Sequence, residues 1–183
     1  MTFILVSVIV AIAASIGGLI AIYTKKEIEQ FDKWIKYSEI ALSILLAILM
    51  ISAHKSMWPV LFLIVGAVFV ILLNKSLFHI HLNRFIRALM FGFALGILFN
   101  INKDIAFPFA VILSLHNIIK GSRIGAYYLD KRKNIFKVIG NFQAIFIIAA
   151  LLGFYVFSNQ LLQAVVLNFA AGAVITTAIG TKI

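Results

Sequence analysis

Cysteine is absent from the 183 residues, and proline occurs only twice. The absence of cysteine excludes disulfides and thiolate-bound metals, and it leaves the redox compartment undetermined. Charged residues are also scarce, at 12% of the chain, whereas a soluble domain carries about 25%. Apolar residues make up 63%, and the mean hydropathy is +1.11. Such a composition cannot cover a globule with polar side chains, so lipid must be the solvent for most of the chain.

The few charged residues are mostly basic and give a formal net charge of +10. A nucleic-acid-binding protein would gather such residues on one polar face. Here they stand in short breaks between apolar runs, which is the pattern of a polytopic membrane protein. We therefore expect the lipid bilayer as the partner and exclude nucleic acid.

A helix needs about 20 apolar residues to cross the hydrocarbon of a bilayer. The runs that reach or approach this length are 2–23, 35–54, 57–74, 85–100, 105–129, 134–157 and 160–180. The sequence thus predicts an all-α bundle of about seven transmembrane helices, in one integral membrane domain over 1–183. The first run lacks a basic start and continues past "AIAAS", which favours a retained helix over a cleaved signal peptide.

Basic residues are distributed unequally between the two sets of connections. The even-numbered connections hold two, Lys55 and Lys103. The odd-numbered connections hold eleven, namely Lys25, Lys26, Lys33, Lys36, Lys75, Arg84, Arg87, Lys131, Arg132, Lys133 and Lys137. The positive-inside rule then predicts an N-terminus outside and a C-terminus inside, with the plasma (inner) membrane as the expected location.

The run 105–129 contains polar residues near its middle. His116, Lys120, Arg123 and Tyr127 follow one another at spacings of four, three and four, so they share one helix face. Ionisable residues at this depth usually face the bundle interior or a water-filled path. Lys120 and Arg123 could instead reach the cytoplasmic interface with their long side chains. His116 and its neighbour Asn117 are too short for that, so they require partners.

Two pairs of glycines stand four residues apart in neighbouring runs. Gly92 and Gly96 lie in "FGFALG", and Gly121 and Gly125 lie in the next run. Small residues at this spacing allow helices to approach closely within a membrane. The pattern predicts close packing between the helices at 85–100 and 105–129.

The stretch "LHNIIKGSRIG" resembles the His-Asn-x-Pro-Glu-Gly-x-x-x-Gly signature of the ZIP family of divalent-metal transporters. In that family, two such signatures in helices four and five form a metal site at mid-membrane. "FLIVGAVFVILLNKSLFHIHL" is similar to the third helix of the family, "KRKNIFKVIGNFQAIFIIAALLGFYVF" to the sixth, and "LLQAVVLNFAAGAVITTAIG" to the seventh. The resemblance implies a ZIP-like bundle with the N-terminus outside. The family's eighth helix has no counterpart here.

The sequence departs from the family at the expected metal ligands. Ile119 and Lys120 replace the Pro-Glu pair of the signature. Aligning the other signature on Gly92 and Gly96 puts Arg87 and Ala88 at its His-Asn positions, and Phe91 at its Glu position. A zinc or iron site needs about four converging nitrogen and oxygen ligands, and an ammonium repels the ion. The inherited site is therefore expected to be dismantled.

One function implied by the resemblance is transport of a divalent metal, zinc or iron, as the substrate. His116 and Asn117 would then be the remaining ligands, Asp104 an outer recruiting group, and His79 and His81 an inner release site. Two of these assignments have simpler explanations. Asp104 also suits the first turn of a helix, and the two histidines also suit a solvated interfacial loop.

The alternative is a non-transporting scaffold or regulatory subunit that keeps the transporter fold. Lys120 would then be a fixed charge that closes the former site, paired with Glu39, although Lys36 is another candidate partner for Glu39. The sequence does not determine whether the protein forms a homodimer. An enzyme is not expected, because the chain has no H-E-x-x-H motif, no cysteine and no paired catalytic carboxylates.

Overall fold

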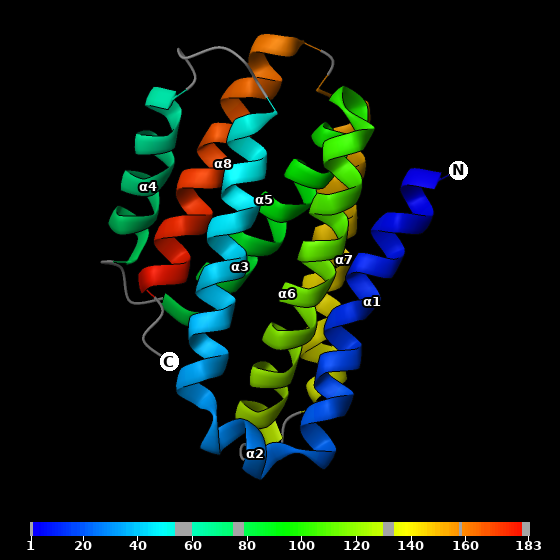
Figure 1. Cartoon of the computed structure of the whole chain (residues 1–183), viewed down its shortest axis with the longest axis vertical. Helices are drawn as coiled ribbons and strands as arrows, with labels where there is room; N and C mark the ends of the chain where they lie inside the picture. The colour runs from blue at the N-terminus through cyan, green and yellow to red at the C-terminus, as the bar shows by residue number, and fades with distance from the viewer. Residues whose placement is uncertain (1, 54–59, 75–78, 130–133, 158, 181–183) are drawn as a thin grey trace.

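The computed structural model describes residues 2–53, 60–74, 79–129, 134–157 and 159–180. Within these ranges the chain forms helices and no strands. The helices are α1 (Thr2–Tyr23), α2 (Lys25–Gln30), α3 (Asp32–Ser52), α4 (Val60–Asn74), α5 (His79–Ile101), α6 (Lys103–Leu129), α7 (Ile135–Tyr155) and α8 (Gln160–Gly180). Figure 1 shows the long helices side by side, with α2 at the lower end. The all-α prediction is confirmed.

Each of the seven predicted runs forms a helix in the described part of the chain. Five of them, α1, α3, α6, α7 and α8, are long and apolar enough to cross a membrane. Shorter apolar helical stretches lie in α4 and α5, at Leu61–Leu72 and Phe85–Ile101. Large apolar side chains are exposed along the outside of the bundle, among them Leu5 and Val111. These lengths and exposed surfaces are those of a helical membrane protein.

The short helix α2 was not predicted. It joins α1 to α3, and its only buried residue is Ile28, which packs with Ala21 of α1 and Ala126 of α6. One apolar residue among charged ones gives no periodic signal over six positions, so the sequence pattern could not reveal this helix.

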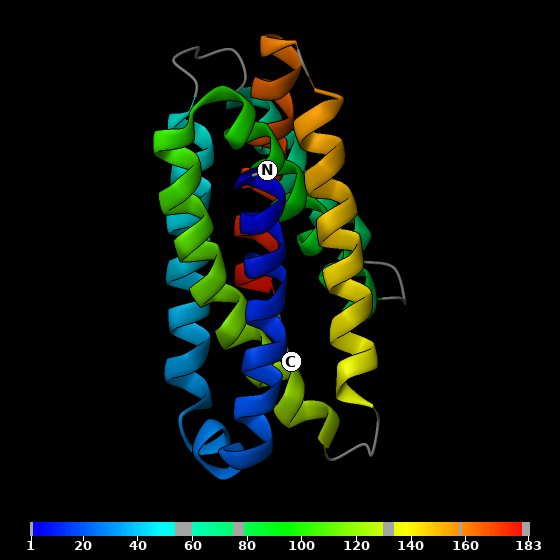
Figure 2. The same ribbon diagram turned by 90° about the vertical axis from the view of Figure 1, so that its right-hand side faces the viewer.

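The helices pack as two groups. Helices α1, α5, α6 and α7 contact one another, whereas α8 packs on both α3 and α4. Figure 2 shows α1 in front, with α6 crossing behind it from the upper left to the lower right and α7 at the right. The groups meet where α3 contacts α6 and where α5 contacts α8. Charged side chains gather at this junction.

The glycines allow close helix approach as predicted, but with different partners. A Cβ on Gly121 would lie 2.1 Å from the Ala14 carbonyl oxygen of α1. A Cβ on Gly92 or Gly96 would lie 2.4 or 2.1 Å from carbonyl oxygens of α7. The prediction that these glycines join α5 to α6 is therefore wrong. Small residues mark a helix face, but they do not identify which neighbour covers it.

Gly121→Ala is expected to destabilise the protein by about 1–3 kcal/mol, because the new methyl group would push α1 away from α6. Gly140→Ala is the matched control: a Cβ there meets nothing within 4 Å. Alanine favours the helix by roughly 1 kcal/mol over glycine, so the control should be neutral or slightly stabilised. Thermal unfolding in dodecyl maltoside measures both variants. Equal melting temperatures would contradict the close α1–α6 contact.

Candidate functional site

A single carboxylate joins the two helix groups. Glu39 of α3 is buried, and each of its oxygens accepts a hydrogen bond from a different arginine. Arg87 Nη1 of α5 lies 2.6 Å from Oε1, and Arg123 Nη1 of α6 lies 2.6 Å from Oε2. Arg87 also donates through Nη2 to the carbonyl of Thr177 in α8. Charged and polar groups from four helices therefore meet at this point.

The network continues from Glu39 to the end of the bundle that carries α2. Arg123 Nε donates to Asp32 Oδ1 at 3.1 Å, and the Asp32 side chain is half-exposed. Asp32 and Glu39 are seven residues apart, so they lie on one face of α3, two turns apart. The buried Arg–Glu–Arg cluster is thus connected to a carboxylate that solvent can reach.

Arg87 is not the loop charge that the sequence pattern indicated. Its side chain is only 3% exposed, and it lies within α5. Without Arg87, ten basic residues remain in the odd-numbered connections and two in the even-numbered connections. The unequal distribution of basic residues therefore remains. Arg123 does not extend to water as an isolated cation, since it binds both Glu39 and Asp32.

The structure adds two arginines to the predicted partners of Glu39, which were Lys120 and Lys36. Arg87 and Arg123 each donate a hydrogen bond to Glu39, and Lys120 is attracted to the same carboxylate. The sequence indicates that Glu39, a carboxylate in an apolar helix, needs a cation, but it does not indicate which cation.

The two candidate metal ligands of α6 point in different directions. His116 is fully buried and lies edge-on to Phe91 of α5, with the ring centroids 5.2 Å apart. Neither nitrogen of its ring has a hydrogen-bond partner among the described residues. Asn117 Nδ2 donates to the Val10 carbonyl of α1 at 3.0 Å. Consecutive helical residues are about 100° apart, so the two side chains do not converge.

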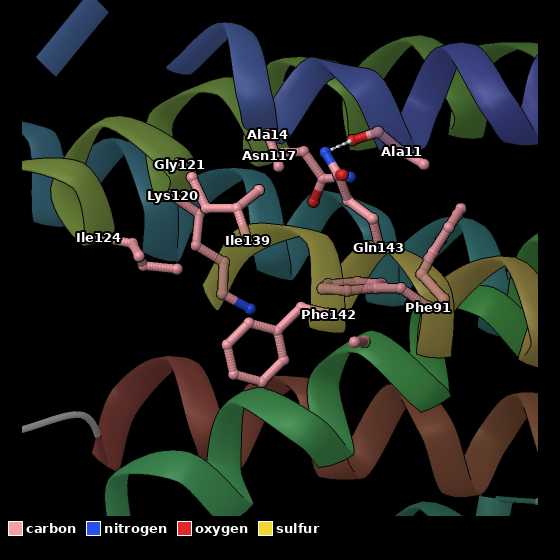
Figure 3. A pocket seen from close by; sticks show the side chains of 12 residues that line it. Ala11, Ala14, Phe91, Asn117, Lys120, Gly121, Ile124, Ile139, Phe142 and Gln143 are labelled. Carbon is pink, nitrogen blue, oxygen red and sulfur yellow. Dashed lines mark hydrogen bonds between the residues drawn. The ribbon is translucent and has the colours of Figure 1, made fainter. Parts of the chain in front are cut away.

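A cavity of about 50 Å³ lies between α1, α5, α6 and α7. Its polar lining consists of Asn117, Lys120 and Gln143, and Phe91 is part of its wall. Figure 3 shows the Lys120 side chain extending along the cavity, with Gln143 bonded to Ala11. That bond is 2.8 Å long, from Nε2 to the Ala11 carbonyl. Lys120 therefore brings a positive charge into a mostly apolar space, and sequence reasoning had not identified Gln143.

The other predicted site residues do not join this cluster. Asp104 is exposed in the first turn of α6, where its N–H donates to Asn102 Oδ1 at 2.9 Å. Nineteen residues separate it from Arg123, about 28 Å along a helix. The side chains of His79 and His81 lie outside the described part of the chain. Within that part, no group of three or more His, Cys, Asp or Glu residues could hold a metal ion.

Comparison with protein-family models and with curated proteins gives no match to this chain.

Proposed function

We propose that the chain is a ZIP-like integral membrane protein that does not transport divalent metals and serves as a scaffold or regulatory subunit. The observation that carries this proposal is the pairing of Glu39 with Arg87 and Arg123. When the sequence is aligned with the two ZIP signatures, Arg87 stands at the histidine position of the signature in helix four. Lys120 stands at the glutamate position of the signature in helix five. Two unit charges 4 Å apart repel by about 4 kcal/mol at an effective dielectric of 20, and a divalent ion is repelled more strongly.

The position of the ion pairs of Glu39 also supports a protein in which α5 and α6 do not move relative to α3 and α8. Metal transport by alternating access would rock α5 and α6 against the remaining helices, as the family resemblance implies. Glu39 and the Thr177 carbonyl hold these two helices to α3 and α8 through buried charged hydrogen bonds. Separating one partner from a buried pair costs about 3–5 kcal/mol. Such a clamp opposes the movement that transport requires.

The proposal includes an orientation in the plasma (inner) membrane. Lys25, Lys26 and Lys33 lie at the end of the bundle that carries α2, beside Trp34 and Tyr37. Both aromatic side chains are largely exposed, at 72% and 65%. Exposed aromatic residues are typical of the membrane interface, and basic residues of its cytoplasmic side. This end would face the cytoplasm, with the N-terminus outside and the C-terminus inside.

Divalent-metal transport is the second candidate function, and His116 favours it. A buried imidazole whose nitrogens both lack a hydrogen-bond partner within the described ranges is an available metal ligand. A zinc or iron ion would then be the transported substrate.

Zinc uptake into proteoliposomes distinguishes the two functions. The unaltered protein should show only background uptake and no saturable zinc binding by calorimetry. Lys120→Glu should gain measurable zinc binding, because it exchanges a repelling ammonium for a carboxylate near His116. Lys103→Glu, at the exposed start of α6, is the matched control and should gain none. Uptake by the unaltered protein that His116→Ala abolishes would contradict our proposal and establish the transport function.

A further inference from the structure

The end of α3 nearest to α2 carries basic and aromatic side chains on its outer surface. Lys33, Trp34 and Tyr37 are exposed, and Lys36 is partly exposed. Residues three and four apart are neighbours on a helix surface, so Lys33 adjoins both Lys36 and Tyr37. We call these four residues the α3 patch. Figure 1 shows that this part of α3 lies at one end of the bundle, together with α2.

Apolar side chains continue the outer face of α3 beyond the α3 patch. Ile44, Leu45 and Ile48 are exposed there. Because a helix rises 1.5 Å per residue, Ile44 lies about 16 Å along the axis from Lys33. Tryptophan and tyrosine beside lysine, at the end of an exposed apolar surface, are typical of the headgroup level of a bilayer. The α3 patch therefore lies at the level of lipid phosphates, and the apolar residues lie at the level of the acyl chains.

The acidic residues of α3 do not neutralise the two lysines of the α3 patch. Asp32 and Glu39 are the acids of this helix, and both accept hydrogen bonds from arginines of the bundle. The adjoining α2 contains two lysines and two glutamates, so it adds no net charge. Lys33 and Lys36 take part in none of the ion pairs found among the described residues. They therefore carry positive charge on the outer surface of α3.

We propose that the α3 patch binds the headgroup of an anionic phospholipid. The ammonium groups of Lys33 and Lys36 donate hydrogen bonds to the phosphate, and the rings of Trp34 and Tyr37 lie against the glycerol region. A basic residue near an anionic membrane surface favours binding by about fivefold. A zwitterionic lipid offers no net charge and gains less. The inference rests on the membrane location in the proposed function, and it does not depend on whether the chain moves a metal.

Quenching of Trp34 fluorescence by brominated lipids tests the proposal. Trp58 is the other tryptophan of the chain, so the measurement uses the Trp58→Phe protein. This protein is reconstituted in equal mixtures of phosphatidylglycerol and phosphatidylcholine, with bromine near the ester groups of one lipid or the other. We expect stronger quenching when the anionic lipid carries the bromine, corresponding to a preference of about fivefold or more. High salt should reduce the preference, because it screens the charges.

Lys33→Gln combined with Lys36→Gln should remove the preference, so that the two lipids quench equally. Glutamine is a long, helix-forming side chain like lysine, so the fold should not change. Lys103→Gln is the matched control and should keep the preference. Lys103 is exposed at the start of α6, about 30 Å along that helix from Arg123. A preference that persists in the double variant would overturn the proposal, because other groups would then select the lipid.

Three results with the Trp58→Phe protein would also overturn the proposal without any further variant. Equal quenching by the two lipids would mean that the α3 patch selects no anionic headgroup. Loss of the preference on addition of sodium phosphate at constant ionic strength would mean that it binds free phosphate instead of lipid. Quenching by neither lipid would contradict the membrane location itself. None of these measurements involves metal uptake, so they are independent of the test of metal transport.

Discussion

Glu39→Gln is expected to lower the stability of the folded protein by about 3–5 kcal/mol, among the largest effects of any single substitution in this chain. The change preserves the size of the side chain but removes its charge. Arg87 and Arg123 would then remain buried without the carboxylate that accepts a hydrogen bond from each of them. For a protein of this length, the loss corresponds to a fall in melting temperature of roughly 10 °C or more.

Glu29→Gln is the matched control for this prediction. Glu29 forms an ion pair with Lys25 in α2, with 3.6 Å between Oε1 and Nζ and both side chains substantially exposed. An exposed pair of this kind contributes about 0–1 kcal/mol, so its loss should hardly change the unfolding curve. A Glu39→Gln protein as stable as the control would show that the buried carboxylate does not hold the helix groups together.

The sequence predicted the helices well because their signal is local. Each long apolar run forms a helix close to the expected bounds, since a run of this composition has one stable structure in lipid. The glycine faces were also recognisable. Their partners were not, because Gly92 contacts α7 and Gly121 contacts α1, and nothing within either segment specifies the distant helix. Pairing between helices depends on the whole bundle.

The polar site was predictable in its residue types but not in its connections. His116 and Asn117 were identified as intramembrane polar groups that need partners, and Glu39 was identified as a candidate partner of Lys120 or Lys36. Arg87 was assigned to a loop because it stands at the edge of an apolar run, and the long α5 helix carries it into the bundle instead. Arg87 and Arg123 lie 48 and 84 positions from Glu39 in the chain, so only the fold brings these residues together.

The second large effect is expected for Arg87→Met and for its combination with Glu39→Leu. Arg87→Met alone should cost about 3–5 kcal/mol, because Glu39 loses one of its two charged hydrogen bonds and the Thr177 carbonyl loses its donor. In the double variant Arg123 keeps Asp32, which is half-exposed, so no buried arginine lacks a carboxylate. The methionine and leucine side chains have similar sizes to the residues they replace and can fill the same space.

The double variant should therefore be more stable than the sum of the two single effects predicts, with a coupling of about 1–3 kcal/mol. Unfolding curves of the four proteins of this cycle measure the coupling directly. Strict additivity would mean that Arg87 and Glu39 act independently, contrary to their 2.6 Å contact. Recovery of stability would show that an apolar pair can hold α3 against α5. The charged pair would then have a role other than stability, such as excluding a divalent ion from the junction.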